Sequence, residues 1–331
     1  MKNLFRILFA AILFSAMLTT SCKKDDDDKP PVEENKNFAT LKTYLISNTL
    51  DIPNVIDGWI TTAENVYNTN NDSVADNDFY VIDIRKASDY ANGHIENAVN
   101  STLGNILTAA ANANGHTIIV ACYTGQTASH AVVALRLSGY PNAKVMKWGM
   151  SGWTTADGND HWTGGTGDAA GPSGNWEAAP GKLATLINYG DPVLTTTATD
   201  GAGILKERVE KLLAAGFQKI SNADVLANPN DYFINNYWQE GDVTHYGHIK
   251  GAYRILPLSL AGGEYQNYDP SRTAVTYCWT GQTSSMVTAY LYVIGYKSKS
   301  LLFGTNGMIH SELNSHKWNA SLSKNYPLST K

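Results

Sequence analysis

Two cysteines of this 331-residue chain stand in the same six-residue pattern. It reads Cys-Tyr-Thr-Gly-Gln-Thr at 122–127 and Cys-Trp-Thr-Gly-Gln-Thr at 278–283, and the chain has three cysteines in all. A cysteine is nucleophilic as its thiolate, which a ring of backbone amides stabilises. A buried structural cysteine does not need the Gly-x-Thr that follows Cys122 and Cys278. The pattern therefore indicates two reactive sulfur sites.

Each pattern follows a β-branched run and precedes a helix-like stretch. A sulfur placed between a strand and a helix faces unpaired N–H groups and the positive end of the helix dipole. Gly125 and Gly281 allow the backbone dihedrals that such a turn requires. Thr127 and Thr283 are expected to cap the helices. We expect this arrangement to lower the thiol pKa and to stabilise a persulfide.

Other landmarks recur in the same order in both halves. Gly-His-Ile at 93–95 returns at 247–249, and each half continues past its cysteine to Gly-x-x-Gly, at 149–152 and 304–307. Landmarks in constant order and at nearly constant spacing predict a duplicated structural unit.

The elements around these landmarks predict an α/β fold. Apolar runs at 80–82 and 118–120 are continuous rather than alternating, which favours a parallel sheet covered on both faces. The stretch 205–217 has helical periodicity and is expected to open the second domain or to pack between the two. The predicted division is a first domain at 38–180, a linker at 181–204 and a second domain at 205–331. Each domain is expected to be a parallel sheet flanked by helices.

Together these pieces resemble the rhodanese (sulfurtransferase) family. The matching residues are Asp-x-Arg at 83–85, Gly-His-Ile-x-x-Ala at 93–98, the loop Cys-x-x-Gly-x-Thr, and the Gly-x-x-Gly that precedes Trp153. The resemblance covers most of 40–325, as two tandem domains. It implies transfer of a sulfane sulfur from thiosulfate or a persulfide to a thiol or cyanide, through a persulfide on the loop cysteine.

The resemblance also assigns residues. Cys122 and Cys278 would be the nucleophiles, and no metal or organic cofactor is implied. Four residues are interpreted as structural support rather than catalytic groups, namely Asp83, Arg85, His94 and His248. The amide cradles would be Tyr123, Thr124, Gly125, Gln126 and Thr127 in the first loop, and Trp279, Thr280, Gly281, Gln282 and Thr283 in the second.

Two features of the loops narrow the chemistry. Related phosphatases place an arginine six residues after the cysteine, where this chain has Ala128 and Ser284, so little is present to bind phosphate bidentately. Neither loop contains a basic residue to hold the sulfonate of thiosulfate. Thiosulfate is therefore expected to be a poor donor, and a persulfide with an apolar body a better one.

The second half departs from the family pattern. Asn236 and Trp238 stand where the first half has Asp83 and Arg85, so the ion pair is lost. Both halves keep the cysteine, and Cys122 is favoured because its domain retains more of the motifs. A disulfide between the two cysteines would require the two loops to meet face to face and is not expected.

Three histidines receive simple interpretations. His130 lies on the helix after Cys122 and is expected at the surface. His245 and His248 have a metal-like spacing, but no further ligands cluster near them in the sequence, so no metal site is expected.

Two other function classes remain open. Rhodanese-like domains can bind a protein partner or carry a persulfide without efficient turnover, and the missing ion pair motivates this alternative. A thiol peroxidase or oxidoreductase is less favoured, because no resolving cysteine accompanies either loop.

The N-terminus predicts export. Lys2 and Arg6 precede an apolar run at 7–18 and small residues before Cys22, which resembles a bacterial lipoprotein signal at 1–22 with Cys22 as the lipid-bearing residue. The alternatives are a plain secretory signal or an uncleaved anchor.

The next segment, 23–37, is charged and contains prolines, as a solvated tether does. It resembles the signal of surface lipoproteins in Bacteroides-like bacteria, which predicts an outer-membrane lipoprotein facing the periplasm or the cell surface. A tether without sorting content is the alternative. The net charge of −5 gives no indication of nucleic-acid binding.

Overall fold

The computed structural model describes residues 32–74 and 78–331. The predicted signal peptide, Cys22 and most of the predicted tether lie outside these residues. Among the described residues, no helix combines the length and apolar character needed to cross a membrane.

The first half contains a five-stranded sheet in the order β1-β5-β4-β2-β3, and all its pairs are parallel. The strands are β1 (Ile60–Thr61), β2 (Tyr80–Asp83), β3 (Val99–Asn100), β4 (Ile118–Ala121) and β5 (Lys144–Met146). The helices are α1 (Val32–Ser47), α2 (Ile52–Val55), α3 (Ala63–Thr69), α4 (Ala87–Asn92), α5 (Ile106–Ala110), α6 (Gln126–Leu137) and α7 (Met150–Trp153).

The second half contains a four-stranded parallel sheet in the order β7-β11-β10-β8. Its strands are β7 (Lys219–Ile220), β8 (Tyr232–Asn236), β10 (Thr273–Tyr277) and β11 (Ser298–Leu301); β6 (Trp176–Glu177) pairs antiparallel with β9 (His248–Ile249). The helices are α8 (Ala170–Ser173), α9 (Gly201–Ala215), α10 (Asn222–Ala227), α11 (Glu240–Tyr246) and α12 (Gln282–Val293). The α/β class, with helix-covered parallel sheets, is confirmed.

The predicted helix at 205–217 is α9, which begins four residues earlier. Asp200 accepts a hydrogen bond from the Gly203 amide at 2.9 Å and so caps the helix at its N-terminus. Its apolar face, which includes Leu205, Val209 and Leu212, is buried in the core.

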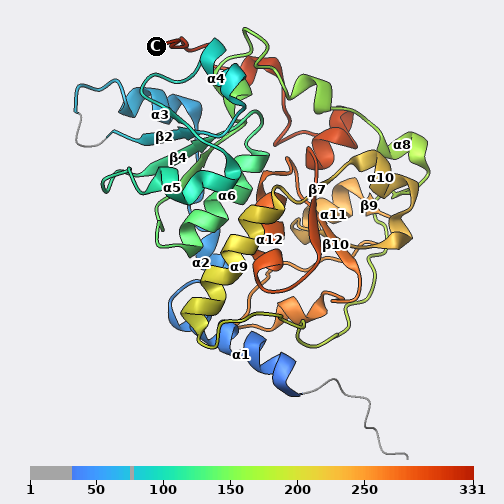
Figure 1. The fold of residues 1–331 in the computed structure, drawn as a ribbon. Coiled ribbons are helices and arrows are strands. Elements are labelled where there is room, and N and C mark those ends of the chain that lie inside the picture. The colour runs from blue at the N-terminus through green and yellow to red at the C-terminus, as the bar shows by residue number, and fades with distance from the viewer. Residues whose placement is uncertain (1–31, 75–77) are drawn as a thin grey trace, which may run out of the picture.

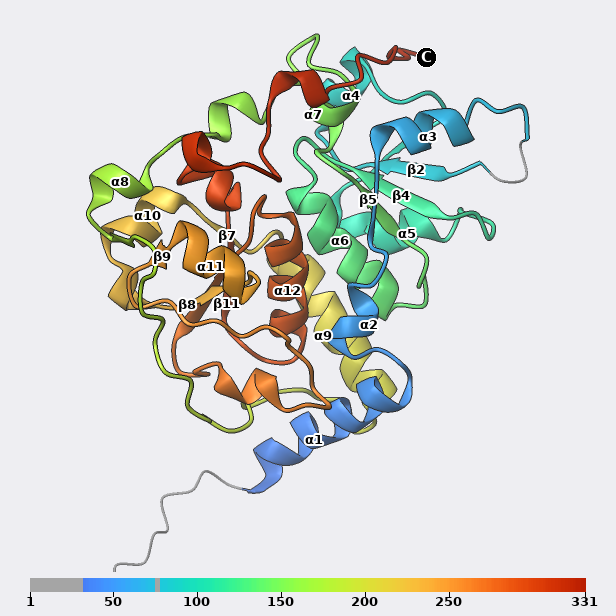
Figure 2. The same ribbon diagram turned by 180° about the vertical axis from the view of Figure 1, so that it is seen from behind.

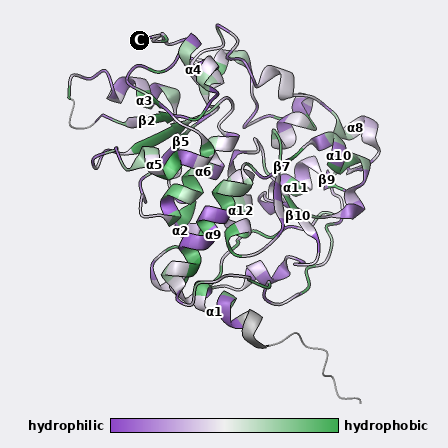
Figure 3. Cartoon of the chain, viewed as in Figure 1, coloured by the Kyte–Doolittle hydropathy of each residue, from purple (hydrophilic) through white to green (hydrophobic). Residues whose placement is uncertain are grey.

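The helices α6 and α12, which follow the two cysteines, pack against each other and against α9 between the two sheets (Figure 1). One buried apolar cluster includes side chains from all three helices. Figure 3 shows hydrophobic residues concentrated in the first sheet and in these central helices. The N-terminal ends of α6 and α12 therefore lie in the same region of the molecule.

The first helix of the described residues and the C-terminal segment each pack against the other half. In α1, the Phe38 ring lies 5.4 Å from the Tyr265 ring of the second half. At the other end, Ser329 pairs with the backbone of His94, and the Trp153 indole donates to Pro327 O at 3.0 Å. Figure 2 shows the C-terminal segment beside α4 and α7. The predicted domain boundaries therefore divide the sequence only. In the fold, α1 and the C-terminal segment each pack against the other half.

Candidate active site at two cysteine loops

The first loop is a tight curl between β4 and α6. Cys122 follows the last strand residue, and Gly125 begins the helix with a φ of 83°, the left-handed conformation that glycine favours. Beneath the loop, a side chain at Gly149 would collide with Cys122 O and the Thr124 amide. The Met150 amide donates to Cys122 O at 2.7 Å. Two glycines and one strand end thus fix the backbone around the sulfur.

Backbone amides point at the Cys122 sulfur. The amides of Gly125 and Ala128 donate to Sγ at 3.1 and 3.4 Å. Burial raises the pKa of the Cys122 thiol, and the loop amides, led by that of Ala128, only partly offset it. The cradle is present, but the predicted net lowering of the pKa is wrong, because Cys122 is only 1% exposed.

The second loop has the same frame. Gly281 begins α12 with a φ of 74°, and a side chain at Gly304 would collide with Cys278 O. The Thr305 amide donates to Cys278 O at 3.0 Å, as Met150 does in the first loop. The sulfur contacts differ, since Cys278 Sγ lies 3.3 Å from the Ser284 amide and 3.5 Å from its hydroxyl.

The predicted threonine caps are wrong in both loops. Neither helix has a side-chain cap hydrogen bond, because the left-handed Gly125 and Gly281 are the cap residues. Serines one turn into the helices contact the caps instead. Ser129 Oγ donates to Gly125 O at 2.8 Å, and Ser285 Oγ donates to Gly281 O at 2.5 Å.

Behind the first loop, Asp83 and Arg85 form a buried ion pair with an Nη2–Oδ2 distance of 2.7 Å. The remaining guanidinium contacts reach Asn159 Oδ1 at 2.8 Å and Gly93 O at 2.7 Å. All three guanidinium nitrogens are engaged with protein atoms, so Arg85 ties segments together and does not point at a substrate. This geometry agrees with a structural role.

In the second half, strand pairing places Asn236 beside Tyr277, as Asp83 lies beside Ala121 in the first. The side-chain amide of Asn236 lies near the Tyr277 hydroxyl but makes no hydrogen bond of ordinary geometry with any described residue. Trp238, at the position of Arg85, stacks on Trp279 with ring centroids 4.4 Å apart. An aromatic stack thus replaces an ion pair beside the second cysteine.

Three residues beside the first loop were not identified from the sequence, namely Lys86, Asp89 and His161. The Tyr123 hydroxyl donates to the Asp89 carboxylate and accepts from the Lys86 amide at 3.2 Å, and the His161 ring lies edge-on at 4.5 Å. This hydrogen bond lowers the pKa of Asp89, while burial and then Asp89 raise the pKa of Tyr123. A negative charge therefore lies next to the loop. Only the fold brings α4 to this place.

The two histidines of the Gly-His-Ile elements form local hydrogen bonds. His94 Nδ1 contacts Tyr90 O at 3.0 Å, and His248 Nδ1 contacts Ile249 O at 2.9 Å. Within the described residues, no three His, Cys, Asp or Glu side chains gather in a way that could hold a metal ion.

The prediction that His130 lies at the surface is wrong. His130 is fully buried, with its ring 5.6 Å from that of Phe217, and neither ring nitrogen has a hydrogen-bond partner among the described residues. Burial lowers its pKa to about 3. The burial was not visible in the sequence, because α9 and α12, which lie far from His130 in the chain, cover α6.

The two cysteine loops meet where the two halves of the chain are in contact. Gln126 Oε1 accepts a hydrogen bond from the Phe303 amide at 2.7 Å, and Gln282 Nε2 donates to Thr124 O at 3.3 Å. The predicted cradle concerns the backbone amides of the two glutamines, and their side chains in addition reach the other half of the chain. No disulfide joins the two described cysteines.

An aromatic cluster from both halves lies beside this contact. The Trp162 ring centroid is 4.7 Å from that of Trp148, 5.2 Å from that of Phe303 and 5.8 Å from that of Trp318. Trp162 Nε1 donates to Thr124 O at 3.1 Å. The first loop is thus braced by side chains from both halves.

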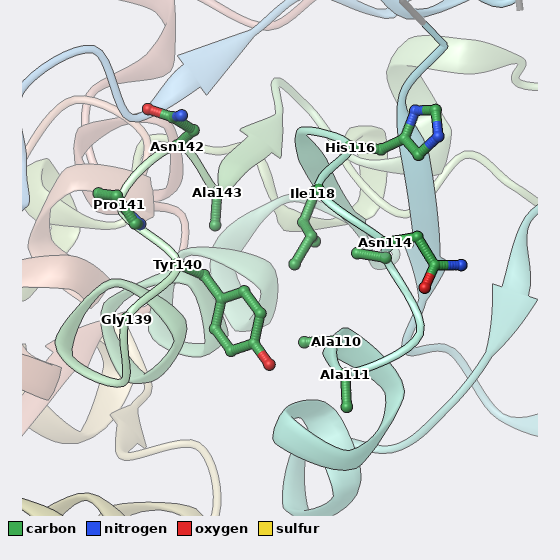
Figure 4. A pocket seen from close by; sticks show the side chains of 12 residues that line it. Ala110, Ala111, Asn114, His116, Ile118, Gly139, Tyr140, Pro141, Asn142 and Ala143 are labelled. Carbon is green, nitrogen blue, oxygen red and sulfur yellow. The ribbon is translucent and has the colours of Figure 1, made fainter. Parts of the chain in front are cut away.

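A cavity of about 360 Å³ opens at the other end of strand β4 from Cys122. Figure 4 shows Ile118, Tyr140 and Ala143 among its lining residues. Ile118 is the first residue of β4, whereas Cys122 follows the last. This cavity is therefore separate from the cysteine chemistry.

The comparisons with known proteins agree with the first half of the site. The sequence pattern of the Rhodanese-like domain matches residues 62–156, so the chain contains a rhodanese-like domain. No curated protein matches the chain.

Solved structures of low similarity also match. The reduced Bacillus anthracis CoADR-RHD is 20% identical over 32% of this chain and 18% of its own, with a TM-score of 0.24. SSP1007 from Staphylococcus saprophyticus is 21% identical over 31% of this chain and 96% of its own, with a TM-score of 0.25. The thiosulfate sulfurtransferase from Pseudomonas aeruginosa is 15% identical over 86% of this chain and 48% of its own, with a TM-score of 0.29. This chain thus spans less than two thirds of the first and third proteins, and these likenesses do not bear on function.

Proposed function

We propose that this protein is a sulfurtransferase that carries sulfane sulfur as a persulfide on Cys122. The observation that carries the proposal is the pair of amides, from Gly125 and Ala128, that donate to the Cys122 sulfur. Amides aimed at one sulfur stabilise an anion there, whether thiolate or persulfide. The rhodanese-like domain over residues 62–156 supports the same chemistry.

The proposed reaction has two displacements. The Cys122 thiolate attacks the outer sulfur of a persulfide R–S–S⁻, a Cys–S–S⁻ bond forms, and R–S⁻ leaves with the electrons of the broken S–S bond. A cyanide or thiolate acceptor then attacks the outer sulfur, and the Cys122 thiolate is the leaving group. The thiol proton goes to solvent before the first step, and no metal or organic cofactor takes part.

The surroundings disfavour thiosulfate, which carries an anionic sulfonate directly next to the transferred sulfur. The Arg85 guanidinium is occupied by Asp83 and Asn159, so it does not hold a sulfonate. The ionised Asp89 beside Tyr123 repels a sulfonate close to the loop. A low-molecular-weight persulfide is therefore the proposed donor.

The equivalent frame around Cys278 supports the further proposal that the second half is a second rhodanese-like unit. Attachment to the outer membrane through a lipid on Cys22 remains a proposal from the sequence, as do the tether and the signal peptide.

The test is mass spectrometry of the purified full-length chain after exposure to glutathione persulfide or, separately, thiosulfate. The expected result is a gain of one sulfur on the Cys122 peptide, removed by cyanide with release of thiocyanate. Absence of any adduct, with both thiols still open to alkylation, would refute sulfur transfer.

A persulfide-carrier or binding module is the second candidate. The burial of both cysteines, at 1% and 2% exposure, favours it, because a buried sulfur turns over slowly unless the site opens. One sulfur bound per chain without repeated thiocyanate formation would support this alternative and contradict efficient catalysis.

A further inference from the structure

A chain of hydrogen bonds runs from the second half of the protein to the sulfur of the first. Gln282 Nε2 donates to Thr124 O at 3.3 Å, and Thr124 O belongs to the peptide unit whose N–H is that of Gly125. This N–H donates to Cys122 Sγ at 3.1 Å. The same carbonyl also accepts from Trp162 Nε1 at 3.1 Å. Two side-chain donors therefore act on one peptide, and that peptide acts on the sulfur.

Hydrogen bonds in such a chain strengthen one another. A donor at the carbonyl oxygen shifts electron density along the conjugated peptide and makes its N–H a better donor. The gain is larger when the acceptor is an anion, because charge-assisted hydrogen bonds are stronger than neutral ones. The chain therefore stabilises a thiolate or persulfide at Cys122 more than it stabilises the thiol.

The packing holds Gln282 at this position. Gln282 is 1% exposed, so water does not compete for its amide. A side chain at Gly125 would lie 3.1 Å from Gln282 Cδ, so the amide group rests directly on the loop. Gln126, the equivalent residue of the first loop, instead contacts the Phe303 amide and the Thr124 hydroxyl. Of these two glutamines, Gln282 is the one hydrogen-bonded to the Thr124–Gly125 peptide, whose N–H donates to the Cys122 sulfur.

We propose that Gln282 is a positioning residue for Cys122, which polarises the Thr124–Gly125 peptide from the other half of the chain and so promotes the anionic form of the sulfur. The importance of this residue for catalysis rests on the proposed function, whereas its effect on the thiol does not. It makes the second half a contributor to the first site even when Cys278 carries no sulfur.

The experiment follows alkylation of Cys122 by iodoacetamide across pH, by peptide mass spectrometry of the full-length chain. Gln282→Met keeps the length of the side chain and removes its donors. Trp162→Phe removes the other donor to the same carbonyl and keeps an aromatic ring. Gln266→Met is the matched control, because Gln266 donates to Asp191 and is not in hydrogen-bond contact with either loop.

The expected result is an upward shift of the apparent pKa of Cys122 in both test variants and none in the control. Below this pKa, alkylation should slow about two- to fourfold, the share of a charge-assisted hydrogen bond that chain cooperativity supplies. The rate at high pH should stay that of the parent. An unchanged pH profile, or a change in the high-pH rate alone, overturns the proposal, since looser packing alters access without moving the pKa.

The same samples are then exposed to glutathione persulfide. Failure of the parent to load sulfur refutes the proposed function and leaves the pH profile as an independent result. Loading by the parent, with no shift in the profile of Gln282→Met, refutes the role of Gln282 alone.

Discussion

The two cysteine loops share a backbone and differ in what touches the sulfur. In both, a left-handed glycine opens the helix and a second glycine lies under the loop. The first loop directs the amides of Gly125 and Ala128 at Cys122. At the position of Ala128 the second loop has Ser284, whose hydroxyl lies 3.5 Å from Cys278 Sγ.

This hydroxyl is one of two contacts that Ser284 makes with the sulfur. The Cys278 thiol donates to Ser284 Oγ, and the Ser284 amide lies 3.3 Å from the same sulfur. Ser284 Oγ also lies 2.9 Å from Ser300 Oγ. The first loop therefore presents two backbone amides to its sulfur, whereas the second presents one amide and one hydroxyl. The same backbone frame surrounds both sulfurs, and one side chain makes this difference.

The largest expected effect separates the two nucleophiles. Cys122→Ser should slow thiocyanate formation from glutathione persulfide by at least about 100-fold, because a hydroxyl does not replace a thiolate nucleophile. Cys278→Ser should slow it less than about tenfold. Turnover is measured at saturating cyanide, with circular dichroism to confirm folding. A larger loss in Cys278→Ser than in Cys122→Ser would reverse the comparison of the loops.

The second prediction concerns the residues behind each loop. Asp83→Leu leaves the buried Arg85 charge without its partner and should lower the free energy of unfolding by about 3–5 kcal/mol. Asn236→Leu replaces an amide that makes no ordinary hydrogen bond and should change it by less than about 1 kcal/mol, or stabilise the fold.

Urea unfolding of both variants measures the difference. Equal losses would mean that Asn236 has a partner of the same importance as Arg85 and that the two halves are supported alike.

Much of the site's frame was predictable from the sequence, because it is local. The helix-opening glycine of each loop, the strand before its cysteine and the helix after it lie within a few residues of one another. The loss of the ion pair was also visible, since Asn236 and Trp238 occupy its positions.

The contacts between halves were not predictable, because they join residues far apart in the chain. The bond from Gln282 to Thr124 spans 158 residues. The burial of His130 follows from helices that cover α6 on several sides, which a single helical period does not reveal. The raised pKa of Cys122 likewise depends on how completely the fold buries the sulfur.

The third prediction uses that raised pKa. Because burial disfavours the charged form, alkylation and sulfur loading of Cys122 should rise about tenfold per pH unit and continue to rise above the ordinary cysteine pKa of about 8.5. The contribution of the Cys122 thiol to the free energy of unfolding is present below the pKa that this thiol has in the unfolded chain. It is lost as the pH rises through the higher pKa that the thiol has in the folded protein.

Alkylation rates between pH 6 and 10 check this expectation. A plateau already reached near pH 7 would show that the amides outweigh burial in solution.

The smallest expected effect tests the contact between the Ser284 hydroxyl and the Cys278 sulfur. Ser284→Ala gives the second loop the residue of the first and removes the acceptor for the Cys278 thiol proton, so Cys278 should alkylate about two- to tenfold faster, the equivalent of one net hydrogen bond. Ala128→Ser is the reciprocal change and should slow Cys122. Peptide mass spectrometry after timed alkylation resolves both cysteines in one sample. Slower alkylation of Cys278 in Ser284→Ala would mean that the hydroxyl donates to the sulfur, and both loops would then present only hydrogen-bond donors to their cysteines.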